Sequence, residues 1–318
     1  MTLTFKKLLP LVKDYPFKPY LYLKSFGISR QSINLFFEEE IKLRFLKDPL
    51  IESFVFAGQL NAAVLFRKLG FDTEILQQKV GKIDYLLSEG QEASLLEIIK
   101  NLIISFQKID LEYVTYRLSS KDTATIAGLE AHRFERVDEY NILLAPAHFD
   151  LDFKEDSSVS IREATEADIT TLQKNIAPSF IYSRFFTDIK ISKKNAIKMH
   201  EEWIANSIKK QVADHVLVAT IENKPVGFIS LEMDKDAYKY LNKRIGHIPL
   251  IGTDPEFRGR HIGLSLTKAA FKRWFSEQQA ELIRIETQAS NIPANKTYLK
   301  AGFTNVDKAI TLRWSNQE

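Results

Sequence analysis

Apolar positions in the second half of the chain switch between the spacing of a helix and the spacing of a strand. Over 261–279 they recur at steps of three and four, which predicts a helix that buries one face. These positions are Ile262, Leu266, Ala269, Ala270 and Trp274. Alternating or uninterrupted apolar runs predict strands at 159–163, 215–221, 226–232, 244–252, 281–287 and 308–314, with other helices at 195–210 and 292–300. This order of elements predicts an α/β fold with a mixed sheet.

The first half of the chain repeats the end of this pattern. Its predicted helix carries apolar residues at helical spacing and precedes a strand that begins at Leu111, as the helix 261–279 precedes a strand from Glu281. The apolar residues of that helix are Leu95, Ile98, Ile99, Leu102 and Phe106. At nearly the same offset, 124–134 lies against 294–303. A spacing kept through helix, strand, helix and strand predicts a duplicated domain.

A change of composition marks the predicted boundary between the two copies. In residues 146–158, acidic and small polar residues separate two apolar, periodic regions, which is typical of a linker. A chain of 318 residues suits two domains of ordinary size. We therefore predict one domain over 1–150 and a second over 151–318.

Composition excludes several classes of protein. Hydrophobic residues make up 45% and charged residues 27% of the chain, as in globular proteins. With no cysteine, there is no disulfide framework, cysteine nucleophile or thiolate metal site. The six histidines include no closely spaced pair with carboxylates at ligand spacing, so no metal site is predicted.

Charge and hydropathy give expectations about location and partners. Lysine, aspartate and proline interrupt the N-terminal segment before it reaches the length of a signal peptide or membrane span. We therefore expect a cytoplasmic protein that does not bind membranes. A net charge of +3 mildly favours an anionic ligand but is too small and dispersed to predict nucleic-acid binding. A homodimer is compatible with the sequence.

The segment D-P-E-F-R-G-R-H-I-G at 254–263 carries the sharpest chemical signal. It follows a predicted strand and opens a predicted helix, where unpaired backbone N–H groups and the helix dipole form a site for a pyrophosphate. Arg258 and Arg260 add positive charge, and Gly259 and Gly263 allow close approach to the backbone. The alternative is a basic turn with no chemical role.

Together with three other segments, this turn resembles the GCN5-related N-acetyltransferase (GNAT) superfamily over about 159–314. The segments are I-R-E-A-T-E-A-D at 161–168, L-I-G-T at 250–253 and N-I-P-A-N-K-T-Y-L-K-A-G-F at 291–303. The resemblance implies the acyl-CoA N-acyltransferase fold, here in two tandem GNAT-like domains, and acetyl transfer from acetyl-CoA to an amine. Arg258 and Gly263 match the superfamily pattern of the turn, but His261 stands where its first glycine is expected. This side chain either narrows the loop or donates a hydrogen bond to a phosphate.

The resemblance implies a role for each matching residue. Backbone N–H groups of the predicted strand bind pantetheine and polarise the thioester carbonyl, an arrangement similar to an oxyanion hole. Tyr298 corresponds to the tyrosine that protonates the departing thiolate, and its alternative role is packing in the core. Asn291 contacts the cofactor, caps a helix or does both. The implied cofactor-binding residues are Ile251, Gly252, Thr253, Arg258, Gly259, Arg260, His261, Ile262, Gly263 and Asn291.

The general base is harder to predict. The segment R-I-G-H-I-P-L-I-G at 244–252 contains no carboxylate, and His247 is its only group that titrates near neutral pH. We take His247 as the candidate base. The alternatives are a structural histidine and removal of the amine proton through water.

Short segments upstream resemble one group within the superfamily, the TDP-fucosamine acetyltransferases, which acetylate the amine of a nucleotide-linked deoxysugar. They include S-R-F at 183–185, W-I-A-N at 203–206 and I-E-T-Q-A-S-N at 285–291. By this resemblance Arg184, Phe185 and Trp203 bind the acceptor, where a guanidinium suits a diphosphate or sugar hydroxyls. Two other readings stay open: acetylation of a peptide or protein amine, and a non-catalytic acyl-CoA-binding module.

The first half lacks the chemistry of the second at the corresponding positions. Opposite 258–263 it has S-E-G-Q-E-A at 88–93, which replaces both arginines and adds two acids. Lys121 lies opposite Asn291, and Gly128 lies opposite Tyr298. We therefore predict a degenerate first domain that keeps the scaffold without the cofactor motif.

Overall fold

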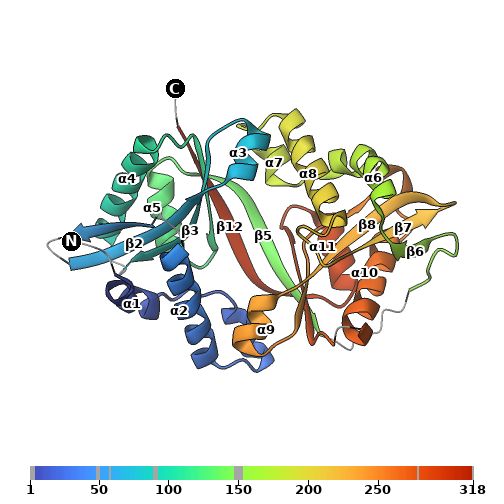
Figure 1. Cartoon of the computed structure of the whole chain (residues 1–318), viewed down its shortest axis with the longest axis horizontal. Coiled ribbons are helices and arrows are strands. Elements are labelled where there is room, and N and C mark those ends of the chain that lie inside the picture. The colour runs from blue at the N-terminus through green and yellow to red at the C-terminus, as the bar shows by residue number, and fades with distance from the viewer. Residues whose placement is uncertain are drawn as a thin grey trace. The chain divides into compact units, whose positions relative to one another are not determined.

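The computed structural model describes residues 4–47, 51–56, 59–88, 92–146, 153–277 and 279–316. The chain forms two compact units (Figure 1). Unit 1 comprises Met1–Glu139 and Lys308–Glu318, and unit 2 comprises Tyr140–Asp307. Among the described residues, no helix is both long enough and apolar enough to cross a membrane.

Unit 1 is a mixed sheet in the order β1-β2-β3-β4-β12, with helices on both faces. The β3–β4 pair is parallel, and the other pairs are antiparallel. Alternate residues of β2 face opposite layers: Val64 packs with α4 and α5, and Leu65 packs with α1 and α2. The strands are β1 (Ile51–Phe56), β2 (Gln59–Lys68), β3 (Val80–Ser88), β4 (Tyr113–Ser119) and β12 (Thr304–Ser315). The helices are α1 (Phe5–Asp14), η1 (Leu21–Phe26), α2 (Arg30–Lys47), α3 (Gly70–Leu76), α4 (Glu92–Lys108) and α5 (Thr123–Ala131).

Unit 2 has the same design, with strand order β5-β11-β9-β8-β7-β6 and β10 paired to β8. Alternation again separates two cores: Ile229 packs on the side of α10 and α11, and Phe228 packs on the side of α6 and α8. The strands are β5 (Glu135–Pro146), β6 (Ser160–Glu163), β7 (His215–Ile221), β8 (Lys224–Met233), β9 (Ile245–Ile248), β10 (Ile251–Thr253) and β11 (Leu282–Gln288). The helices are η2 (Glu166–Asp168), α6 (Ile169–Ile176), η3 (Ala177–Ser179), α7 (Arg184–Thr187), α8 (Lys193–Ile208), α9 (Lys235–Leu241), η4 (Pro255–Phe257), α10 (Ile262–Lys272), the π-helical η5 (Arg273–Glu277) and α11 (Ile292–Lys300).

The two halves of the sequence exchange their last strands. β5, which ends the first half, pairs with β11 of unit 2, and β12, which ends the second half, pairs with β4 of unit 1. Leu143 and Ala145 therefore belong to the core of unit 2, and Leu312 and Trp314 belong to the core of unit 1. The predicted boundary at residue 150 instead places β5 in the first domain and β12 in the second. Of the predicted linker 146–158, residues 147–152 lie outside the described part of the chain.

The predicted mixed α/β fold class is confirmed, and two of the predicted elements are each divided in the structure. The helix predicted over 261–279 ends its α-helical part at Lys272 and continues as η5, where Trp274 is buried against Gly246. A Cβ atom on Gly246 would lie 2.8 Å from the indole ring, so only glycine fits there. The strand predicted over 244–252 is divided into β9 and β10, and this break shapes the site described below.

The strand exchange predicts that the halves depend on each other to fold. Each of the fragments 1–152 and 153–318 lacks a strand that supplies core side chains and covers an open edge of the sheet. We expect the two fragments to be insoluble or partly folded when expressed alone and to copurify when expressed together. Size-exclusion chromatography and circular dichroism provide the measurement. Two fragments that are each soluble, folded and monomeric would contradict the pairing.

Candidate functional site

The sheet of unit 2 opens where β9 ends. β9 and β11 pair in parallel over only four residues, from Ile245 opposite Leu282 to Ile248 opposite Ile285. The next residue, Pro249, cannot donate a backbone hydrogen bond. Beyond it, among the strands that the structure describes, β10 pairs with β8 alone. The sheet therefore splits between β10 and the end of β11.

Ser230 on β8 stabilises the break between β9 and β10. Its backbone N–H donates to the carbonyl oxygen of Leu250 at 2.8 Å, and the N–H of Leu250 donates to Ser230 Oγ at 3.0 Å. Ser230 therefore satisfies both backbone polar groups of Leu250 at the break.

The predicted thioester-binding residues Ile251, Gly252 and Thr253 form β10, at this opening. Gly252 faces α6, and a Cβ atom there would lie 2.5 Å from Ile176 Cγ2 and 3.1 Å from the ring of Phe180. Glycine is therefore required for the close approach of this layer to β10.

The turn 254–263 ends in a helix whose first backbone N–H groups are open. Asn291 caps α11 through a hydrogen bond from the Ala294 N–H, whereas the N-cap residue of α10, His261, makes no side-chain capping bond. Gly259 adopts a left-handed backbone with φ +80°, and His261 does the same with φ +58°. The uncapped N-terminus of an eleven-residue helix fits a pyrophosphate. The left-handed φ also explains why glycine is expected at position 261.

The two arginines of the turn have different surroundings. Arg258 is exposed and, within the described residues, makes no ion pair or hydrogen bond through its guanidinium. Arg260 donates from Nε to Asp156 and from Nη2 to Ser158 Oγ, each at 2.8 Å. Hydrogen bonds from Ser158 and Arg260 lower the pKa of Asp156 to about 2. Of the two, Arg258 is therefore the arginine left available to a ligand.

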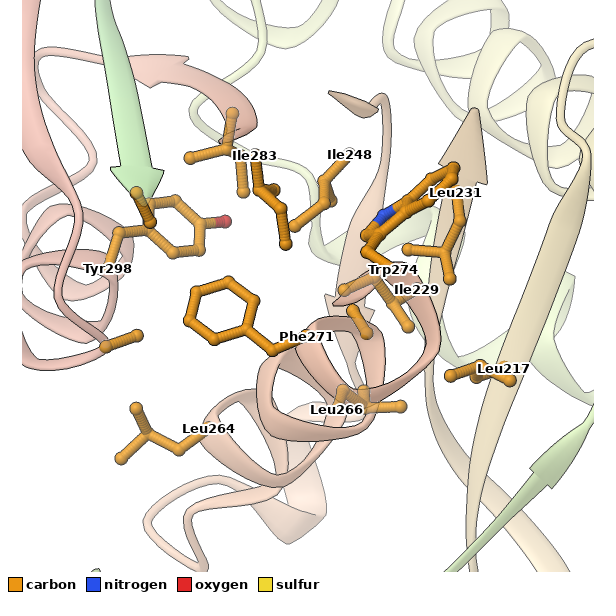
Figure 2. Packing of buried hydrophobic residues seen from close by; sticks show 14 of the residues in the cluster. Leu217, Ile229, Leu231, Ile248, Leu264, Leu266, Phe271, Trp274, Ile283 and Tyr298 are labelled. Atoms are coloured by element: carbon orange, nitrogen blue, oxygen red, sulfur yellow. The ribbon is translucent and has the colours of Figure 1, made fainter. Parts of the chain in front are cut away.

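Tyr298 lies on α11 in the core of unit 2, between this helix and the sheet. Figure 2 shows its ring beside Phe271, with the oxygen directed toward the side of Ile283 and Ile248. Only 5% of the residue is exposed, and burial raises the pKa of its hydroxyl. The phenol is therefore protonated at neutral pH, as a proton donor must be. The same placement also serves packing.

His247 belongs to a polar group on the opposite side of β9 from Ile248. Its Nδ1 lies 3.7 Å from Glu232 Oε2 on β8, and it is paired in register with Arg284 on β11. Burial and the charge of Arg284 lower the pKa of His247, although Glu232 opposes this effect. Arg284 also lies 3.9 Å from Glu286, the first residue of β11 beyond the parallel pairing. The imidazole is therefore neutral at pH 7.

Glu232, Arg284 and Glu286 are not among the predicted residues, because they lie on β8 and β11 and not on the strand predicted over 244–252. The alternation R-I-E at 284–286 places Arg284 and Glu286 on one face of β11, and this signal could have identified them.

The residues predicted to bind the acceptor lie around His200, which is not among the predicted site residues. Arg184 lies 3.9 Å over the ring of Phe185, which meets Trp203 edge to face at 5.2 Å. His200 contacts both rings and stacks on Phe180, with centroids 4.7 Å apart. Burial lowers the pKa of His200 to about 4. Phe185 is only 2% exposed, so Arg184 and Trp203 are the members that a ligand can reach.

This aromatic cluster reaches the opening in the sheet. Phe180 both stacks on His200 and borders Gly252 of β10. The structure therefore brings the predicted acceptor segment next to the predicted thioester-binding strand.

One cavity contains none of the predicted site residues. It has a volume of about 320 Å³ and is lined by Met233, Tyr238, Arg244, Glu277 and Gln279. Across the described ranges, no three side chains of histidine, aspartate or glutamate are grouped to hold a metal ion.

Comparison with known sequences identifies an enzyme domain. Residues 181–303 match the sequence model of the acetyltransferase (GNAT) family. Mycothiol acetyltransferase of Sanguibacter keddieii is 34% identical over 92 residues, which cover 29% of this chain and 29% of that protein. The match thus spans less than a third of that relative. The spore coat polysaccharide biosynthesis protein SpsD of Bacillus subtilis is 20% identical over 250 residues, or 78% of this chain and 81% of that protein.

The fold has a solved counterpart along nearly the whole chain. A tandem GNAT protein from the clavulanic acid biosynthesis pathway superposes with a TM-score of 0.55 at 13% identity, covering 99% of this chain and 95% of that one. At this identity the likeness concerns the fold, and it confirms the acyl-CoA N-acyltransferase fold in tandem form.

The left-handed backbone of His261 leads to a stability prediction. Glycine adopts this conformation without steric cost, so His261→Gly is expected to raise the free energy of unfolding by about 0.5–1 kcal/mol. Gly259→Ala is the matched control: its added Cβ would meet nothing within 4 Å, so the left-handed φ alone should lower stability. Thermal denaturation measures both.

Calorimetry with acetyl-CoA then separates the two roles considered for the imidazole. We expect affinity to be retained in His261→Gly, because Arg258 and the backbone remain as donors. A clear loss of affinity would instead show that the imidazole contacts a phosphate.

Proposed function

Because residues 181–303 form an acetyltransferase domain of the GNAT family, we propose that the chain transfers the acetyl group of acetyl-CoA to a primary amine of a small molecule. The observation that carries the proposal is the split between β10 and β11 beside the uncapped N-terminus of α10. The split offers backbone N–H groups at a gap in the sheet, and the helix N-terminus offers a site for an anion. Acetyl-CoA needs both, because it carries a thioester and a pyrophosphate.

The proposed reaction uses one group from each side of the sheet. The neutral amine attacks the thioester carbonyl, a C–N bond forms and the C–S bond breaks. Tyr298 gives its proton to the departing thiolate. His247, supported by Glu232, accepts the proton that the amine nitrogen loses. Ile251, Gly252 and Thr253 polarise the carbonyl, and Arg258, Gly259, His261, Ile262 and Gly263 hold the pyrophosphate, with Asn291 beside the cofactor.

For the acceptor we propose the amine of a nucleotide-linked amino-deoxysugar. The segments around Arg184 and Trp203 that resemble the TDP-fucosamine enzymes support this choice. So does the relation over most of the chain to SpsD, whose name places it in polysaccharide biosynthesis. Arg184 borders an aromatic cluster that reaches β10, a position suited to a guanidinium that holds a diphosphate near the reacting amine.

An acceptor panel tests the proposal. Thiol release from acetyl-CoA is followed with nucleotide-linked amino-deoxysugars, peptides and polyamines, and we expect turnover with the first class. Tyr298→Phe should lower kcat about 100-fold with acetyl-CoA binding unchanged, since only the donor hydroxyl is lost. Arg184→Ala should raise the acceptor KM and leave acetyl-CoA binding intact.

Other outcomes of this panel point elsewhere. Turnover with peptides alone would establish a peptide N-acetyltransferase. Acetyl-CoA binding without turnover on any amine would favour a non-catalytic module.

The lowered pKa of His247 predicts the pH dependence. If His247 accepts the proton, it must be neutral, so kcat/KM should rise with pH through an inflection below about 6.5 and then level off. His247→Gln should remove this inflection and lower kcat, whereas Glu286→Gln should keep it. A profile unchanged in His247→Gln and lost in Glu286→Gln would transfer the role to Glu286.

A further inference from the structure

The two units can be aligned residue by residue through their parallel strand pairs. β3 and β4 pair over four residues, from Val80 opposite Tyr113 to Ile83 opposite Tyr116. β9 and β11 also pair over four residues, which aligns Gly81 with Gly246 and Lys82 with His247. The antiparallel neighbours extend the alignment, since Arg67 is opposite Lys82 and Glu232 is opposite His247.

The aligned positions carry opposite chemistry. Glu232, His247 and Glu286 of unit 2 correspond to Arg67, Lys82 and Arg117 of unit 1. Glu286 on β11 and Arg117 on β4 each follow directly after the last residue of the parallel pairing. The proton-accepting group proposed for unit 2 is therefore replaced in unit 1 by three cations.

Two of these cations, Arg67 and Lys82, lie with Arg44 of α2 around one carboxylate whose side chain is largely buried. Asp84, whose side chain is 6% exposed, lies 3.0 Å from Arg44 Nη1, 3.1 Å from Arg67 Nε and 3.9 Å from Lys82 Nζ. We call Arg44, Arg67 and Lys82 the cationic cluster. Among the described residues, Glu40 is a second acid in contact with it: Glu40 binds Arg44 at 2.9 Å and accepts from the hydroxyl of Tyr85.

Within the described residues, the three cations Arg44, Arg67 and Lys82 share two acids, Asp84 and Glu40, and solvent reaches all three cations. The side chains of Arg44, Arg67 and Lys82 are 32%, 43% and 38% exposed. The pKa of Lys82 is lowered by burial and by the charges of Arg67, Arg117 and Arg44, against the effect of Asp84. An added anion would relieve this repulsion.

We propose that the cationic cluster is a binding site of unit 1 for a phosphate-bearing anion. Asp84 positions the guanidinium groups of Arg44 and Arg67, and the exposed faces of these groups and Lys82 contact the phosphate oxygens. Guanidinium groups suit this ligand because they bind phosphate in a planar, bidentate manner. Unit 1 thus keeps the scaffold of unit 2 but binds an acidic rather than a basic ligand at this position.

Binding of inorganic pyrophosphate and of ADP to the full chain tests the proposal. Each variant is compared with the wild type, so that binding at the turn before α10, which is the same in all of these proteins, cancels in the difference. We expect each variant, Arg67→Gln and Lys82→Gln, to weaken binding, and the double variant to weaken it at least about tenfold. Lys100→Gln, on the exposed face of α4, is the matched control and should bind as the wild type does.

Circular dichroism and thermal denaturation establish that the variants are folded, and rising ionic strength should weaken binding. A response to either probe that depends on Arg67 and Lys82 supports the site, and a preference for ADP adds recognition of the nucleoside. No binding to the wild type, or equal binding by the double variant and Lys100→Gln, would show that the cluster is only an ion-pair network. Because the variants lie in unit 1, this result is independent of whether unit 2 acetylates an amine.

Discussion

The short parallel pairing between β9 and β11 is the constraint on which the candidate site depends. After four residue pairs, Pro249 removes a backbone donor, and Ser230 satisfies both polar groups of Leu250. Because Ser230 takes over these two hydrogen bonds, the sheet can split without leaving the backbone of Leu250 unpaired. The split places β10 at a gap and determines which side chains can reach that gap. Tyr298 comes from the core on the α10 side, whereas His247 lies on the other face of β9.

The two units share the length of their parallel pairing, although the polar side chains beside it differ. Gly81 and Gly246 occupy matching positions, so both units have a residue without a side chain at this point of the sheet. The side chains one residue later, Lys82 and His247, differ in charge at neutral pH. Since the strands are held by backbone hydrogen bonds and apolar cores, polar positions at the split can change without loss of the fold.

Features that depend on residues close together in sequence can be predicted, whereas features that depend on contacts between distant segments cannot. The spacing of Ile262, Leu266 and Ala270 gave the buried face of α10 because helical periodicity is local. The exchange of β5 and β12 was not predictable, because the same apolar strand satisfies either sheet edge and only tertiary packing selects one. The break at Pro249 had a visible signal, but the compensating role of Ser230 depends on a neighbouring strand.

The candidate site shows the same limit. The turn has a signal in local sequence, whereas the predicted roles of Tyr298 and the irregularity of His261 come from the family resemblance, and the left-handed φ of His261 supplies the physical reason for the expected glycine. Glu232 and Glu286 were missed, since their proximity to His247 arises from strand register.

The exchanged strands also set the order in which the chain can fold during synthesis. β4 receives its partner β12 only after almost the whole second half of the chain has left the ribosome. Until then, the core around Leu102 and Phe106 lacks Leu312 and Trp314. An intervening segment of this length slows closure of the sheet, because the entropy of a long loop must be lost before the final pairing forms. Unit 1 therefore begins to fold first but gains its last core strand only after the strands of unit 2 have been synthesised.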